Sequence, residues 1–145
     1  MEKEETITQI LLVEHGKLRE MLARFIREAE RDRGAGKMAL DLFIKKERAH
    51  VSIEEKVLFK IRVSKEIKIV KILVKQHKTM TKIIQNLKKL FKDKKDIFEE
   101  AGKLQVFLRV HTNLEEEKFY KVLDREMNSE NKIKLIEKIK ILFDS

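Results

Sequence analysis

The sequence predicts an all-α fold, an antiparallel up-down-up-down four-helix bundle followed by a short fifth helix. The 145 residues include no proline and only four glycines, a composition that suits helical bundles better than strand-and-turn folds. Apolar residues recur at helical spacing through four long segments and a shorter fifth one. Breaks between the long segments divide the chain into helical hairpins, in which neighbouring helices run in opposite directions.

Each predicted helix is defined by its apolar stripe. The stripes run from Ile7 to Ala29, from Leu42 to Ile61, from Ile67 to Phe91, from Ile97 to Val122 and from Ile133 to Phe143. We therefore place the bundle at about residues 5–126 and the additional helix at about residues 129–143, within a single domain that spans residues 1–145.

Turn and capping residues mark the boundaries between these helices. The segment Asp32–Gly36 is a predicted turn, and Asp93–Asp96 is a charged connection whose last aspartate can cap the fourth helix. Ser64 is the only capping residue near the second junction, so that boundary is less clearly marked. Ser129 is a candidate N-cap for the fifth helix.

Composition and charge exclude several classes of function. Because the chain has no cysteine, it cannot form disulfides, ligate an iron–sulfur cluster or use a thiol in catalysis. The net charge of +9 is compatible with a nucleic-acid partner, but lysines alternate with glutamates on the predicted outer faces, and we expect none. We find no transmembrane segment and no signal peptide, and therefore expect no membrane contact and a cytoplasmic location.

The four histidines fall on the apolar stripes, one on each long helix. They are His15, His50, His77 and His111. Glu54 and Glu115 each follow a histidine by four residues and therefore share its inward face. The two halves of the chain repeat this pattern, with a histidine on the first helix of each hairpin and His-x-x-x-Glu on the second.

The spacing of the histidines predicts that they converge in one layer of the bundle. In an antiparallel hairpin, two residues at the same height lie equally far from the turn. The midpoints between successive histidines fall at Asp32–Arg33, at Val63–Ser64 and at Lys94, and all three coincide with the breaks identified above.

Six convergent histidines and glutamates indicate a metal site. Two buried carboxylates would each cost several kcal/mol unless they are paired or bind metal, and neutral imidazoles do not compensate them. A purely structural polar layer is therefore less favoured. Imidazole and carboxylate without thiolate suit iron, manganese or zinc, and six protein ligands match a dinuclear site. A ferritin-like site would need Glu-x-x-His on two helices, and only Glu47 with His50 fits.

At these residues the sequence resembles the hemerythrin-like, or HHE cation-binding, family. The resemblance covers the first four helices and rests on His15, His50-x-x-x-Glu54, His77 and His111-x-x-x-Glu115. It implies two iron ions joined by an oxo or hydroxo bridge. Glu54 and Glu115 would bridge them, His15 and His50 would bind one iron, and His77 and His111 the other.

The sequence departs from the oxygen-carrying members of this family at two positions. Thr81 stands where they have a fifth histidine, and Glu116 where they have an aspartate. We expect Thr81 to face the metal layer and to leave a coordination position open.

The ligand set leaves three functions open. The first is reversible binding of oxygen or nitric oxide, for sensing, carriage or scavenging. The second is a di-iron redox enzyme or an iron donor, which would reduce peroxide or nitric oxide or repair iron centres, with an electron-transfer or iron-acceptor protein as partner. The third is an iron storage or stress module. No nucleophilic triad or phosphate-binding loop is present.

Overall fold

The computed structural model describes residues 5–144. Its helical elements are α1 (Ile7–Arg31), α2 (Arg33–Lys56), a 3-10 turn (Leu58–Lys60), α3 (Arg62–Lys65), α4 (Ile69–Lys92), α5 (Phe98–Glu115), a π-helical segment (Glu116–Tyr120), α6 (Lys121–Glu126) and α7 (Ser129–Asp144). Within those residues there is no β-strand, and the predicted all-α class is confirmed.

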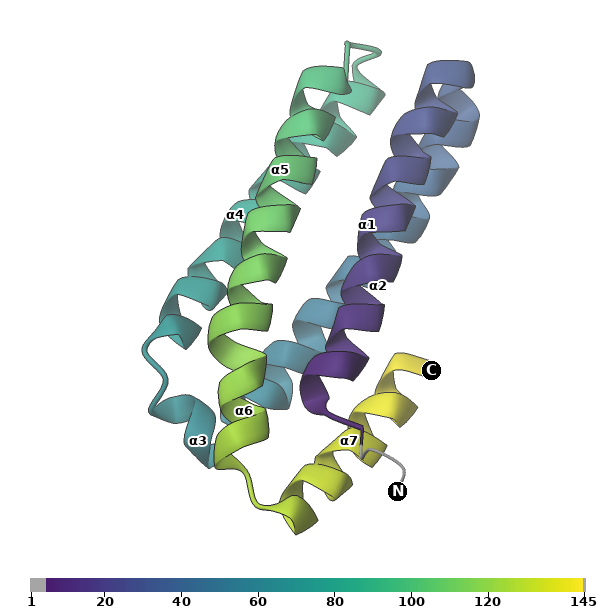
Figure 1. The fold of residues 1–145 in the computed structure, drawn as a ribbon. Helices are drawn as coiled ribbons and strands as arrows, with labels where there is room; N and C mark the ends of the chain where they lie inside the picture. Colours follow the sequence, from purple (N-terminus) through teal and green to yellow (C-terminus); the bar gives the residue numbers. More distant parts are fainter. Residues whose placement is uncertain (1–4, 145) are drawn as a thin grey trace.

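The long helices form two side-by-side pairs, α1 with α2 and α4 with α5 (Figure 1). The π-helical segment and α6 continue the line of α5, so they complete the fourth long helix of the predicted bundle. Helix α7 contacts both α1 and α2 at the end of the bundle where the chain begins. No helix in the described part of the chain is long and apolar enough to cross a membrane.

The boundaries differ from the sequence prediction in two places. The predicted turn at Asp32–Gly36 shrinks to Asp32 alone, which ends α1 and caps α2 by accepting hydrogen bonds from the backbone N–H groups of Gly34 and Ala35. Helix α2 ends at Lys56 rather than near Ile61, because the 3-10 turn and α3 intervene.

The serines predicted near helix boundaries are not caps. Ser64 is buried, and its hydroxyl donates a hydrogen bond to the carbonyl oxygen of Leu58 (2.7 Å), which fixes the turn between α2 and α4. Asn128 takes the role predicted for Ser129, because its side chain accepts from the backbone N–H of Asn131 (2.8 Å). Asp96, predicted to cap the fourth helix, lies one residue before the N-cap Ile97, and its side chain accepts from the backbone N–H of Phe98 at the start of α5 (2.8 Å).

The apolar core consists of two clusters on either side of a buried polar layer. One cluster includes Leu18, Phe43 and Leu104, and the other includes Leu11 and Phe119 together with residues of α7. On α1 the division falls between Leu11 and Leu18, where His15 is fully buried. The polar layer is therefore enclosed by apolar side chains along the bundle axis.

Gly36 allows α1 and α2 to approach closely. A Cβ atom at this position would lie 2.6 Å from the Cα atom of Ala29, so the two helices would have to separate. We expect Gly36→Ala to lower the free energy of unfolding by roughly 1–3 kcal/mol in urea denaturation. Gly102→Ala is the matched control, because nothing lies within 4 Å of its Cβ position in α5. That substitution should stabilise the protein by up to about 1 kcal/mol. Equal effects of the two substitutions would contradict the close packing.

Candidate metal centre

The structure brings the six predicted side chains together in the polar layer. They are His15, His50, Glu54, His77, His111 and Glu115, and all are buried. Their ligand atoms form two groups, each with all atoms within 4.8 Å of one another. One group contains Glu54, His77, His111 and Glu115, and the other contains His15, His50 and Glu115.

Each glutamate contacts one imidazole from either half of the chain. Oε1 of Glu54 lies 3.3 Å from Nε2 of His50 and 3.2 Å from Nε2 of His77. Oε1 of Glu115 lies 3.3 Å from Nε2 of His15 and 3.2 Å from Nε2 of His111. The two carboxylates therefore lie between the histidine pairs, where bridging ligands of a dinuclear site would lie.

Three of the imidazoles are oriented by hydrogen bonds at their outer nitrogens. Nδ1 of each pairs with a side-chain oxygen: His15 with Glu116 (2.6 Å), His77 with Glu55 (3.0 Å) and His111 with Gln76 (2.6 Å). Each partner is adjacent in sequence to another member of the cluster. Such bonds fix the ring so that Nε2 faces the interior, as in metal sites whose histidines are held by outer carboxylates.

His50 lacks the outer hydrogen bond that the internal repeat would give it. Glu14 occupies the position equivalent to Gln76, but its carboxylate lies 2.8 Å from Nζ of Lys46 and 3.1 Å from Nζ of Lys17. Among residues 5–144, Nδ1 of His50 consequently has no hydrogen-bond partner. The ring of Phe143 from α7 lies 5.6 Å from the His50 ring and shields it instead.

Several buried polar atoms of the cluster have no hydrogen-bond partner in the part of the chain that the structure describes. They are both ring nitrogens of His50 and both carboxylate oxygens of Glu115. Leaving such groups unpaired in a core costs about 1–3 kcal/mol each. Imidazole and carboxylate donors that converge without satisfying one another match what a bound metal ion requires, so the residues present fit a metal pair.

The electrostatic surroundings set the protonation of the cluster. Burial lowers the pKa of His111 to about 3, so its imidazole is neutral, the form that binds metals. Burial would raise the pKa of Glu54, but His50 and His77 outweigh it and hold that pKa well below its usual range. Burial raises the pKa of Glu47 to about 7, and the nearby Glu54 adds to the shift.

Tyr120 belongs to the polar layer although the sequence analysis did not find it. Its fully buried hydroxyl donates a hydrogen bond to Oε2 of Glu54 (2.8 Å) and lies 3.1 Å from Nε2 of His15. Burial raises its pKa well above the usual range, so the phenol remains a donor. The π-helical segment brings Tyr120 inward five residues after Glu115. Such segments are frequent at functional sites and have no simple sequence signal.

Thr81 does not face the metal layer, and the prediction that it would is wrong. The residue is exposed, and its hydroxyl donates to the backbone carbonyl oxygen of His77 (3.0 Å). Met80, one residue earlier, is buried and takes the inward position on this turn of α4.

A helical bundle with a buried cluster of four histidines and two glutamates defines a class of proteins that hold metal ions between helices. The family model of the hemerythrin HHE cation-binding domain matches residues 6–123, and the chain belongs to this family. Helix α7 lies outside the matched residues. Among curated proteins and among solved structures, no similar chain is found.

Proposed function

We propose that the chain binds two iron ions joined by an oxo or hydroxo bridge, with Glu54 and Glu115 bridging them. His15 and His50 would hold one ion, and His77 and His111 the other. The observation that carries this proposal is that each carboxylate contacts one imidazole of each pair. The proposal includes an antiparallel course of the four long helices, because that course brings the two halves of the repeat to one layer.

We propose that the protein engages oxygen or nitric oxide for sensing, carriage or scavenging. When bound, the iron pair supplies an exchangeable electron and a position for a diatomic ligand. The chain's own residues orient the imidazoles through their outer nitrogens and exclude water with the apolar clusters above and below the layer. A neutral His111 and a protonated Tyr120 keep the added charge in this layer low.

A redox enzyme, which reduces peroxide or nitric oxide, is the second candidate, and Glu47 favours it. Its carboxyl group is buried in the same region, Oε2 has no hydrogen-bond partner among the described residues, and burial raises its pKa to about 7. A carboxyl of that kind exchanges protons near neutral pH, as reduction of such substrates requires. Turnover with an electron donor would favour this candidate, and a stable oxygenated spectrum would favour the first.

The metal content of the purified protein tests the proposal directly. Protein produced in iron-replete cells should contain about two iron ions per chain, as a two-metal site requires. Elemental analysis gives the stoichiometry, and near-ultraviolet absorption beyond that of the aromatic side chains reports the bridged pair. One zinc ion per chain, or no metal after anaerobic loading with ferrous iron, would contradict the assignment.

A further inference from the structure

The two seams of the bundle that flank the polar layer are not equivalent. The internal repeat relates α1 to α4 and α2 to α5, so the seam between α2 and α4 and the seam between α5 and α1 occupy equivalent places. At the first seam a pocket of about 230 Å³ extends down to His77. At the second, Arg19 lies across the equivalent place.

The pocket at the α2–α4 seam has a polar floor. His77 and Glu47 line it, and both are buried, whereas the exposed Thr81 stands at its rim. Oε2 of Glu47 has no hydrogen-bond partner within the described chain. Since a buried oxygen of this kind requires a partner, water or a small ligand in the pocket would satisfy it. The volume is enough for several atoms of ligand together with water.

At the equivalent place on the α1–α5 seam, the Arg19 side chain reaches from α1 to Thr112 and Glu116. Arg19 stands in the position that corresponds to Thr81, and Leu108 in the position that corresponds to Glu47. Nη1 of Arg19 donates to the Thr112 hydroxyl (3.3 Å) and lies 3.8 Å from the Glu116 carboxylate. A long side chain thus covers this seam where the other has a short one, and an apolar residue replaces the polar floor.

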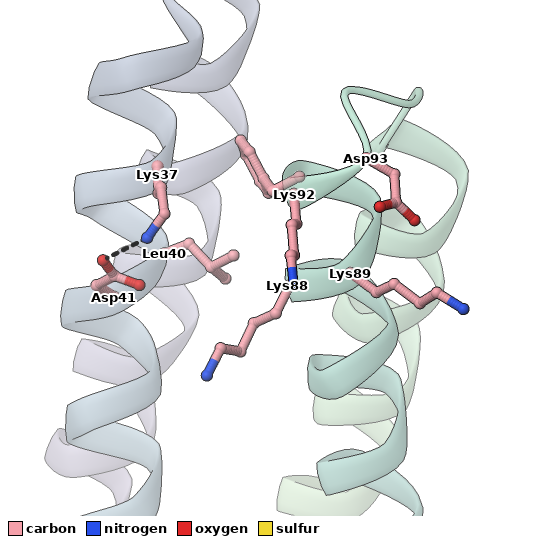
Figure 2. A pocket seen from close by; sticks show the side chains of 8 residues that line it. Lys37, Leu40, Asp41, Lys88, Lys89, Lys92 and Asp93 are labelled. Atoms are coloured by element: carbon pink, nitrogen blue, oxygen red, sulfur yellow. Dashed lines mark hydrogen bonds and ion pairs between the residues drawn. The ribbon is translucent and has the colours of Figure 1, made fainter.

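Basic residues outnumber acidic ones along the open seam. Arg48 and Lys56 line the pocket that reaches His77, together with the acidic Glu47 and Glu55. Farther along the same seam, a second pocket is lined by Lys37 from α2 and by Lys88, Lys89 and Lys92 from α4, as Figure 2 shows. Of these four lysines, Lys37 is paired with Asp41 (3.2 Å). A cationic seam raises the local concentration of small anions and does not repel neutral diatomic molecules.

We propose that small neutral or anionic ligands of two or three atoms reach the metal pair through the α2–α4 seam, on the side of His77, and that Arg19 closes the opposite seam. This inference rests on the proposed function, because it concerns access to that metal pair. It assigns Glu47, beside His77, as the polar group at the buried end of the route and Thr81 as the rim of the entrance.

Thiol labelling tests the route without any metal, because the chain has no cysteine of its own. Met80 lines the pocket, and Leu18 is its counterpart in the repeat at the closed seam; both are about equally buried, at 1% and 0% exposure. With circular dichroism to confirm folding, Met80→Cys should react with methyl methanethiosulfonate at least tenfold faster than Leu18→Cys. Equal rates, or faster labelling of Leu18→Cys, would overturn the route whether or not the protein binds iron.

A second pair of variants tests the route in iron-loaded protein, with azide as the probe. Thr81→Trp fills the rim and should slow the appearance of the azide absorption band at least tenfold. Val110→Trp is the control, because Val110 is exposed on α5 outside the pocket; it should change that rate less than twofold. An unchanged rate in Thr81→Trp would overturn the route, whereas a wild-type protein that binds no iron would instead refute the proposed function.

Discussion

Replacement of Glu54 by glutamine should remove at least half of the iron and should lower the stability of the loaded protein more than that of the metal-free protein. Glutamine keeps the shape of the side chain but supplies no anionic oxygen to lie between His50 and His77. We expect iron content to fall to about one ion or fewer per chain, because metal affinity depends on every deprotonated ligand. Glu115→Gln should behave in the same way.

Thermal unfolding distinguishes this metal site from a structural polar layer. For the wild type, ligand binding to the folded state alone contributes about 4 kcal/mol when free metal exceeds its dissociation constant a thousandfold. Loaded Glu54→Gln should lose most of that contribution. Metal-free Glu54→Gln should lose less than the loaded form, because the only loss there is the weakening of the contacts with His50, His77 and Tyr120, of which the two histidines hold the pKa of Glu54 below its usual range.

Two observations would contradict this prediction. In a structural polar layer the mutation would lower the stability of both forms by the same amount, because only the contacts of Glu54 with His77 and Tyr120 would be weakened in each. Equal melting temperatures of wild-type protein with and without metal would also argue for such a layer. Glu20→Gln is the control, since Glu20 is exposed and its carboxylate pairs with Arg27 on the same helix. It should change neither iron content nor stability measurably.

Tyr120→Phe should weaken metal binding at least tenfold while leaving the fold intact. The phenol supports Oε2 of Glu54, and loss of an outer hydrogen bond to a metal ligand typically costs 10–100-fold in affinity. Phenylalanine fills the same space, so the metal-free variant should lose only about 1 kcal/mol of stability for the missing hydrogen bond. Competition with a chelator of known affinity measures the change.

The chain offers a matched control and an internal reporter for this experiment. Ser64→Ala also removes a fully buried hydroxyl, but one that bonds only the Leu58 carbonyl oxygen in a turn. It should lower stability without changing metal affinity. Tyr120 is the only tyrosine and the chain has no tryptophan, so its emission should be quenched as iron binds in the wild type. Unchanged chelator competition in Tyr120→Phe would show that the phenol does not support the ligands.

The sequence predicted the fold class and the convergence of six side chains because both depend on helical periodicity. His15 and Glu54 lie on stripes of otherwise apolar residues, and period and loop position place them at one height. The position of Tyr120 was not predictable in this way, because the π-helical segment changes the period after Glu115. The prediction that Thr81 faces the metal layer was wrong for a related reason. Four residues after His77 span slightly more than one helical turn, so Met80 and not Thr81 lies on the inward side of α4.

The termini of the helices were less predictable than their faces. Asp32 could be recognised as a break, but not as a single residue that serves two helices at once. The pairing of Glu14 with Lys46 instead of His50 was also not predictable from the sequence, because it depends on how the side chains of α1 and α2 pack against each other. Local pattern determines which residues face inward, whereas such pairings depend on packing between helices.

Helix α7 shields His50 through Phe143, yet it lies outside the residues that match the family. Its hold on the bundle rests on the buried Leu135, Ile136 and Ile139. Segments with few buried contacts open locally at lower free energy than the whole protein unfolds. Detachment of α7 would therefore expose the imidazole of His50 to solvent while the four long helices stay folded. Amide hydrogens of α7 would then exchange with solvent faster than those of α1 or α5. The time for which the buried histidines and glutamates stay shielded from solvent would then be set by the rate at which α7 detaches, and not by the rate at which the bundle unfolds.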